Sequence, residues 1–135
     1  MTEYDLRDET PLQADYLRLR LVSGLSPKTV QAAAAGLPNT VFAVTIRWGE
    51  EVVGMGRIIG DGGLFFQIVD IAVEPAHQGR GLGKAIVARL VDHLRTHAPS
   101  SAYVSLMADG EAHRLYSQFG FKPTAPRSIG MAFVI

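Results

Sequence analysis

The segment from residue 78 to residue 84 carries the most specific chemical signal in the sequence. It lies between a predicted strand and a predicted helix and consists of Gln78, Gly79, Arg80, Gly81, Leu82, Gly83 and Lys84. Glycines let a backbone turn tightly and approach a ligand closely. The free N–H groups at a helix start, together with the helix dipole, favour an anion, and Arg80 and Lys84 add positive charge. We therefore predict that this loop binds a phosphate group.

Two well-known phosphate-binding loops do not fit the segment. The dinucleotide pattern G-x-G-x-x-G, started at Gly79, requires a glycine where Lys84 stands. The Walker pattern requires four residues between its glycines and a hydroxyl residue after its lysine. Here three residues separate Gly79 from Gly83, and Ala85 follows Lys84. Both patterns also expect βαβ units with a parallel sheet, whereas the residues before this loop predict antiparallel hairpins.

The pattern that does fit is Q-x-x-G-x-G, at residues 78–83. Two further features accompany it. The predicted strand at 68–73 ends in a hydrophobic-Ala-Val sequence, and the loop begins five residues after it. Downstream, A-x-x-L-Y at 112–116 is followed by F-G-F at 119–121. In this order and at these separations, residues from about 40 to 121 resemble the GNAT family of acetyl-CoA-dependent N-acetyltransferases.

The resemblance implies how acetyl-CoA, as co-substrate, would bind. Its pyrophosphate would lie on the backbone N–H groups of residues 79–84. Its amide-rich pantetheine arm would run beside the strand like an added strand and pair with Ile71 and Val73. A bulge near this point would splay the strand from its neighbour, and the N–H of Ile71 or Ala72 would stabilise the tetrahedral oxyanion. A neutral amine would attack the thioester directly, and the absence of cysteine agrees with a reaction that forms no cysteine-bound intermediate.

Such a reaction needs an acid and a base. The resemblance assigns the acid to Tyr116, because a tyrosine of pKa near ~10 can return a proton to a departing thiolate of pKa near ~8.5; the alternative is a tyrosine of the hydrophobic core. Histone-modifying relatives have a glutamate base where Gln67 stands, and glutamine cannot serve. Asp70 is the nearest carboxylate, with a structural role as its alternative, so the base stays open. Asp109 either contacts the cofactor arm or caps the following helix.

Several other residues have two interpretations. Arg57 either binds an acidic group of the substrate or forms a salt bridge with a carboxylate such as Asp70. Beside it, Gly-Met-Gly at 54–56 indicates a bulge or a close approach of backbones. His93 and His97 have the spacing of two metal ligands, but no third ligand accompanies them and we predict no metal site. Further candidates on the substrate side are Arg20, Trp48, Phe65 and Phe66.

Segments with the alternating pattern of strands and segments with the spacing of helices must position these residues. Alternating segments separated by turns at 49–50 and 61–63 predict an antiparallel meander, and an apolar stripe of helical spacing predicts a long helix after the glycine loop. The predicted strands are 4–7, 40–48, 52–59, 64–73, 102–107 and 131–135. The predicted helices are 10–20, 30–35, 83–97 and 109–119, with Thr10 and Asp109 as caps. We predict one α/β domain over residues 1–135, with a mixed, mostly antiparallel sheet flanked by helices.

The composition excludes several classes of function. Lys and Arg number 13, as do Asp and Glu, and this net charge of zero argues against a general nucleic-acid binder. A chain without cysteine has no disulfide framework and no thiolate metal site. No apolar run approaches the ~20 residues that cross a bilayer, and residues 1–9 are too polar for a signal peptide. We expect a cytoplasmic protein with no membrane partner.

The resemblance to the GNAT family implies the transfer of an acetyl group to a primary amine. We favour a small-molecule acceptor, because the sequence has no extended acidic tract for a basic peptide. The alternatives are acetylation of a protein lysine or N-terminus, and a non-catalytic module that binds acetyl-CoA. The glutamine at position 67 favours the non-catalytic alternative, whereas Tyr116 opposes it. The apolar strand predicted at 131–135 is a candidate interface for a homodimer.

Overall fold

The computed structural model describes residues 3–135 of the chain. Its sheet has five strands in the order β1-β2-β3-β4-β5. Neighbouring strands from β1 to β4 are antiparallel, and β4 and β5 are parallel. The strands are β1 (Tyr4–Arg7), β2 (Phe42–Trp48), β3 (Glu51–Gly60), β4 (Phe65–Val73) and β5 (Tyr103–Leu106). The predicted mixed, mostly antiparallel sheet is confirmed.

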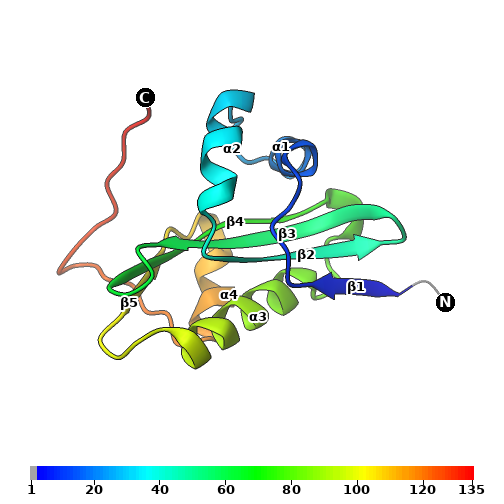
Figure 1. Cartoon of the computed structure of the whole chain (residues 1–135). Helices are drawn as coiled ribbons and strands as arrows, with labels where there is room; N and C mark the ends of the chain where they lie inside the picture. The colour runs from blue at the N-terminus through cyan, green and yellow to red at the C-terminus, as the bar shows by residue number, and fades with distance from the viewer. Residues whose placement is uncertain (1–2) are drawn as a thin grey trace.

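Helices cover both faces of the sheet, as predicted. Figure 1 shows α1 (Gln13–Val22) and α2 (Val30–Gly36) on one face, and α3 (Leu82–His97) and α4 (His113–Ser117) on the other. The layer of α3 and α4 holds the larger cluster of buried apolar side chains, and α1 and α2 hold a smaller one. The sheet is therefore the central layer of three.

The long helix α3 lies close against the centre of the sheet. Its apolar stripe is buried, with Ile86 and Leu90 at 0% exposure, as its helical spacing predicts. A Cβ atom on Gly56 would lie 2.5 Å from Ile86 Cγ2 and 2.8 Å from Ile71 Cδ1. These neighbours are side chains, so the close approach of backbones that was one alternative for residues 54–56 is not observed at Gly56, whereas the other alternative, a bulge, is confirmed opposite it. The missing side chain of Gly56 lets α3 pack directly over the strands that lead to the site.

Strand β4 bulges before its end. Val69 pairs with Arg57 and Ala72 with Met55, so two residues of β4 lie opposite one residue of β3. The first of the two, Asp70, has a φ of 60°, in the left-handed region that non-glycine residues rarely adopt. The pairing of β4 with β5 covers only the first part of β4 and stops at Ile68. The predicted bulge and the divergence of the two strands are confirmed.

Two predictions about the chain ends and caps are wrong. Residues 131–135 form no strand: Phe133 and Val134 are 87% and 90% exposed, and Figure 1 shows this segment leading away from the sheet. Their apolar character favours a strand, but a strand also needs a partner for its backbone groups. Helix α1 begins at Gln13 and has no side-chain cap, so Thr10 does not cap it.

None of the helices in the described part of the chain is long and apolar enough to cross a membrane. The longest, α3, has 16 residues, fewer than the ~20 that span a bilayer, and its exposed face carries charged side chains such as Arg89 and Asp92. Its length and its one apolar face therefore fit packing against a sheet.

Candidate active site

The glycine loop turns the chain into the start of α3. Gly79 and Gly81 have φ values of 77° and 79°, a conformation that glycine adopts at little cost. The first helical hydrogen bond in α3 runs from the Ala85 N–H to the Gly81 carbonyl at 3.0 Å. The N–H groups of residues 82–84 precede it and have no partner within the helix. Because the loop is largely exposed, its backbone can reach an anion.

Neighbouring side chains hold this loop in place. The Gln78 side-chain amide donates to the Val73 carbonyl at 2.9 Å, which ties the loop to the end of β4. Arg80 donates to the Tyr4 hydroxyl at 3.1 Å, and His77 Nδ1 lies 2.8 Å from the same oxygen. Sequence reasoning missed this role of Tyr4, because 76 residues separate it from Arg80.

The end of β4 presents backbone groups toward the gap beside β5. The Glu74 N–H donates to the Val53 carbonyl of β3 at 2.8 Å. Because N–H directions alternate along a strand, the N–H groups of Ile71 and Val73 face the other side. Pairing with β5 has already stopped at Ile68. Of the two residues predicted for the oxyanion, Ile71 and Ala72, this alternation favours Ile71.

A cavity of about 760 Å³ lies beside this gap, within the usual size range of ligand pockets. Helix α1, the segment that follows it, strands β3 and β4, and the chain from β5 into α4 all contribute to it. Predicted site residues that line it are Gln67, Asp70, Ile71, Asp109 and Tyr116, joined by Arg20 and Arg57. Trp48, Phe65 and Phe66 do not line it, and neither does the glycine loop.

Tyr116 belongs to the hydrophobic core, as one of its two predicted alternatives states, and it also lines the cavity. It is only 9% exposed and belongs to the larger hydrophobic cluster, with its ring centre 6.3 Å from that of Phe121. Burial, and secondarily the negative charge of Asp109, raise the pKa of the Tyr116 hydroxyl. The phenol is therefore protonated at neutral pH and available as a hydrogen-bond donor.

Asp70 takes part in a buried ion-pair cluster. Its two carboxylate oxygens lie 2.5 Å from Arg20 Nη1 and 2.7 Å from Arg57 Nη1, and the Tyr16 hydroxyl donates to it at 3.1 Å. The salt bridge that was one alternative for Arg57 is confirmed. A carboxylate whose two oxygens already accept charged donors is poorly suited to remove a proton from an amine, so the structural alternative for Asp70 is the better supported.

Asp109 differs from its expected role as a cap. Its side chain makes no capping hydrogen bond, and its backbone carbonyl accepts the Ala112 N–H at 3.0 Å. A short turn follows Asp109, and the regular helix α4 begins only at His113. The carboxylate remains at the cavity beside Tyr116.

Sequence reasoning missed three of the residues that line the cavity from the α1–α2 side. They are Tyr16, Ser26 and Lys28. Nothing in the local sequence pattern identified which side chains between α1 and α2 would face the cavity. No group of three or more potential metal-binding side chains lies together within residues 3–135.

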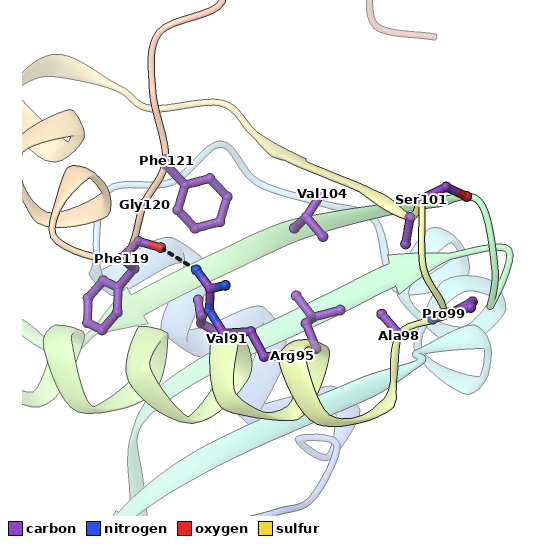
Figure 2. Close-up of a pocket in the computed structure, with 11 residues that line it drawn as sticks. Val91, Arg95, Ala98, Pro99, Ser101, Val104, Phe119, Gly120 and Phe121 are labelled. Carbon is purple, nitrogen blue, oxygen red and sulfur yellow. Dashed lines mark hydrogen bonds between the residues drawn. The ribbon is translucent and has the colours of Figure 1, made fainter.

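A second cavity, of about 430 Å³, lies away from these residues. Figure 2 shows it between the C-terminal half of α3, Val104 of β5 and residues 119–121, with Arg95 donating to the Phe119 carbonyl at 3.2 Å. Its lining combines apolar side chains with exposed polar atoms, and it contains none of the predicted site residues.

The fold and the first cavity define a class of protein: a three-layer α/β domain with an exposed glycine loop at a helix start and a cavity beside a splayed strand. A family comparison gives the particular family. The Acetyltransferase (GNAT) family model matches residues 8–121, and the chain belongs to this family. It is therefore an acyltransferase by family.

Solved and curated relatives agree with this assignment. A protein of unknown function from meticillin-resistant Staphylococcus aureus, a probable acetyltransferase, is 44% identical, has a TM-score of 0.93 and aligns over 98% of this chain and 100% of its own. Serotonin N-acetyltransferase 2 of rice is 37% identical over 60% of this chain and 40% of its own length. Histone acetyltransferase TAP1 of soybean is 32% identical over 54% and 31%. The chain thus spans less than half the length of these curated relatives.

Proposed function

We propose that the protein transfers an acetyl group from acetyl-CoA to a primary amine of a small molecule, by direct attack in a ternary complex. The bulge of β4 at Asp70 carries this proposal, because it opens the backbone beyond Ile68 toward the cavity that holds Tyr116. The residues present fit acetyl-CoA: the glycine loop is exposed, a Cβ at Gly79 or Gly81 would meet nothing within 4 Å, and the helix start offers unpaired N–H groups.

Each part of the site has a role in this reaction. The N–H groups and positive side chains of residues 79–84 hold the pyrophosphate. The N–H groups of Ile71 and Val73 pair with the amides of the pantetheine arm, and Ile71 also lies where an oxyanion forms. Tyr116 gives its proton to the departing thiolate; the nitrogen, as it becomes an amide, loses one proton to solvent, and a solvent proton restores the phenol. Asp109 contacts the cofactor arm, and Asp70 positions the bulge.

The chemistry supplied by acetyl-CoA is an activated thioester, which an uncharged amine can attack without a covalent enzyme intermediate. The protein's part is to orient the thioester, stabilise the developing negative charge and protonate the sulfur. This division of labour explains why a chain without cysteine can catalyse acyl transfer.

Thiol release from acetyl-CoA, measured with a panel of small amines, tests the proposal. Turnover with at least one amine is the expected result. Acetyl-CoA at 100 times its dissociation constant should also stabilise the fold by about 2.7 kcal/mol. If acetyl-CoA stabilises the protein but no amine is acetylated, the non-catalytic module is correct. If a lysine peptide or a peptide N-terminus is acetylated and no small amine is, the acceptor is a protein. If acetyl-CoA neither binds nor stabilises, the cofactor is wrong.

We also propose a homodimer, through the apolar segment at residues 131–135. Among the described residues this segment contacts no strand, and its five side chains are apolar. Strand β5 is at the edge of the sheet, and the groove of Figure 2, which Val104 of β5 lines, adjoins it. An exposed apolar segment of one copy and a free strand edge of another complement each other. Sizing chromatography should give the mass of two chains.

A cytoplasmic location stays a prediction. It rests on a composition typical of compact domains. The rice relative is chloroplastic by name, so the location of the family varies. Fractionation of cells that express the tagged protein decides the point, and recovery in an organelle or membrane fraction would contradict it.

A further inference from the structure

A buried cluster with surplus positive charge lies in the wall of the active-site cavity. Arg20 and Arg57 are each 7% exposed, and the Asp70 side chain between them is 6% exposed. Two guanidinium groups carry +2 and one carboxylate carries −1, which leaves a net charge of +1. Burying a charge is costly unless it is paired, so this cluster lacks one negative charge.

The two guanidinium groups also have donors to spare. Arg20 donates to the Ser26 carbonyl at 2.8 Å, to Ser26 Oγ at 3.0 Å and to Asp70. Arg57 donates to Thr40 Oγ1 at 2.9 Å, to Asp70 and, at 3.5 Å, to a backbone carbonyl. Each guanidinium has five N–H donors, so three are used and two remain on each. Both arginines line the cavity, where a ligand can accept these bonds.

The charges in the cavity wall are segregated. Lys28, in the segment between α1 and α2, adds a third cation beside the arginines. The carboxylate of Asp109 comes from the other wall, where its charge acts on Tyr116. The cavity thus has a positive end toward α1 and α2 and the proposed acid at its opposite side. Between them lies Ile71, next in sequence to Asp70.

We propose that the acceptor amine carries an anionic oxygen group, a carboxylate or a phosphate, that binds to Arg20, Arg57 and Lys28. The inference rests on the proposed acetyl transfer. Because Asp70 directly precedes Ile71, where the thioester carbonyl is expected, the anionic group and the amine are separated by only a few bonds. Short amino acids and amino phosphates have this form, whereas polyamines and arylalkylamines do not.

Matched pairs of acceptors test the inference. Glycine is compared with glycinamide, β-alanine with its amide, and phosphoethanolamine with ethanolamine, each assayed by thiol release. Charge-assisted hydrogen bonds are about twice as strong as neutral ones, so we expect kcat/KM for the better anionic acceptor to exceed that of its neutral partner by about tenfold or more. The carboxylate and phosphate arms show which anion is preferred. Turnover of neutral amines equal to or faster than that of the anionic ones overturns the inference while the acetyl transfer itself stands.

Binding provides a readout that needs no turnover. Propionate and inorganic phosphate, added to the protein saturated with CoA, should raise its melting temperature more than propionamide does. If they do not, the anion site is absent, whether or not any amine is acetylated. Failure of acetyl-CoA to bind is a separate result, and it contradicts the proposed function instead.

Substitution at Lys28 is the gentlest probe of the site, because this side chain is exposed. Lys28→Gln should lower the ratio of anionic to neutral kcat/KM severalfold, and Arg57→Gln should lower it further. Lys122→Gln removes an equal charge from an exposed position outside this cavity and should leave the ratio as it is. If Arg57→Gln disrupts folding, the Lys28 and Lys122 pair still tests the proposal: equal ratios in both variants would contradict an anion site formed by Arg20, Arg57 and Lys28 together.

Discussion

At the scale of single residues, Tyr116 is a packing residue for which we also propose a role as general acid. Its ring is buried in the hydrophobic cluster, and the residue also lines the cavity. Replacing it with phenylalanine keeps the ring and removes only the hydroxyl. If Tyr116 is the general acid, Tyr116→Phe should lower kcat by about 100-fold or more, while the dissociation constant of acetyl-CoA changes less than about twofold. Steady-state kinetics and a binding titration measure the two quantities.

A matched control comes from Tyr103, a half-exposed tyrosine of β5. Tyr103→Phe removes the same hydroxyl from a position outside the cavity and should retain full kcat. A Tyr116→Phe variant as active as Tyr103→Phe would leave Tyr116 with the core role alone.

The raised pKa of Tyr116 predicts the pH dependence of the reaction. Burial and the charge of Asp109 place this pKa above the ordinary tyrosine value of about 10. Since the acid must be protonated, kcat should fall only above about pH 10. Asp109→Asn removes a negative charge that favours the neutral phenol, so the alkaline limb should move to lower pH. Profiles of kcat between pH 8 and 11.5 measure the shift.

Burial also raises the pKa of Tyr16, so spectroscopic titration alone would mix the two tyrosines. The fall of kcat at alkaline pH distinguishes the two tyrosines, because it should disappear in Tyr116→Phe. A limb that stays in place in Asp109→Asn, or moves to higher pH, would contradict the electrostatic effect of Asp109 on Tyr116.

At the scale of elements, the contact between α3 and the sheet depends on one small residue. A Cβ at Gly56 would lie 2.5 Å from Ile86, 2.8 Å from Ile71 and 3.0 Å from Leu90, and Ile86 and Leu90 are fully buried. Overpacking of this kind typically costs about 1–3 kcal/mol. Gly56→Ala should therefore lower the free energy of unfolding by that amount and, by displacing Ile71, raise the KM for acetyl-CoA. Urea denaturation and kinetics measure both effects.

Gly63 offers a control for this substitution. An added Cβ there meets nothing within 4 Å, and no left-handed φ is required. Gly63→Ala should change the free energy of unfolding by less than about 0.5 kcal/mol. Equal unfolding midpoints for the two variants would show that α3 can move away from β3 at no cost.

Elements built on local rules were predictable from the sequence. The turn at 61–63 is one example, since Asp61 Oδ1 accepts the N–H groups of Gly63 and Leu64 only two and three residues away. The glycine loop and α3 likewise follow from a contiguous segment. The site was predictable where its residues lie in family motifs, as for the positions of Ile71 and Tyr116 in the splayed strand and α4.

Contacts between segments far apart in the sequence were harder to predict. The Arg20–Asp70 ion pair joins residues 50 positions apart, and no periodicity in the sequence encodes such a partner. The Asp109 cap failed because a competing backbone turn satisfies the start of that segment. The strand at 131–135 failed because apolar alternation predicts a strand's composition but not whether another strand is available to pair with it.

At the scale of the whole molecule, the exposed apolar segment at 131–135 determines the assembly that we expect. Phe133 is 87% exposed, which is costly for a large apolar side chain in water. Phe133→Glu would place a charge in the proposed interface with β5 of a second copy, so it should convert the dimer to a monomer in sizing chromatography. Gln31→Glu adds the same charge on α2, an exposed position on the other layer, and should remain dimeric.

The outcome also distinguishes the dimer from a segment that folds back on its own chain. In a folded-back monomer the wild type elutes at the mass of one chain, and Phe133→Glu lowers the free energy of unfolding without changing that mass. In the dimer the variant changes the mass, and the melting temperature of the wild type rises with protein concentration, because association stabilises only the folded chain. A wild type that is monomeric at every concentration, with a melting temperature independent of concentration, would contradict the homodimer.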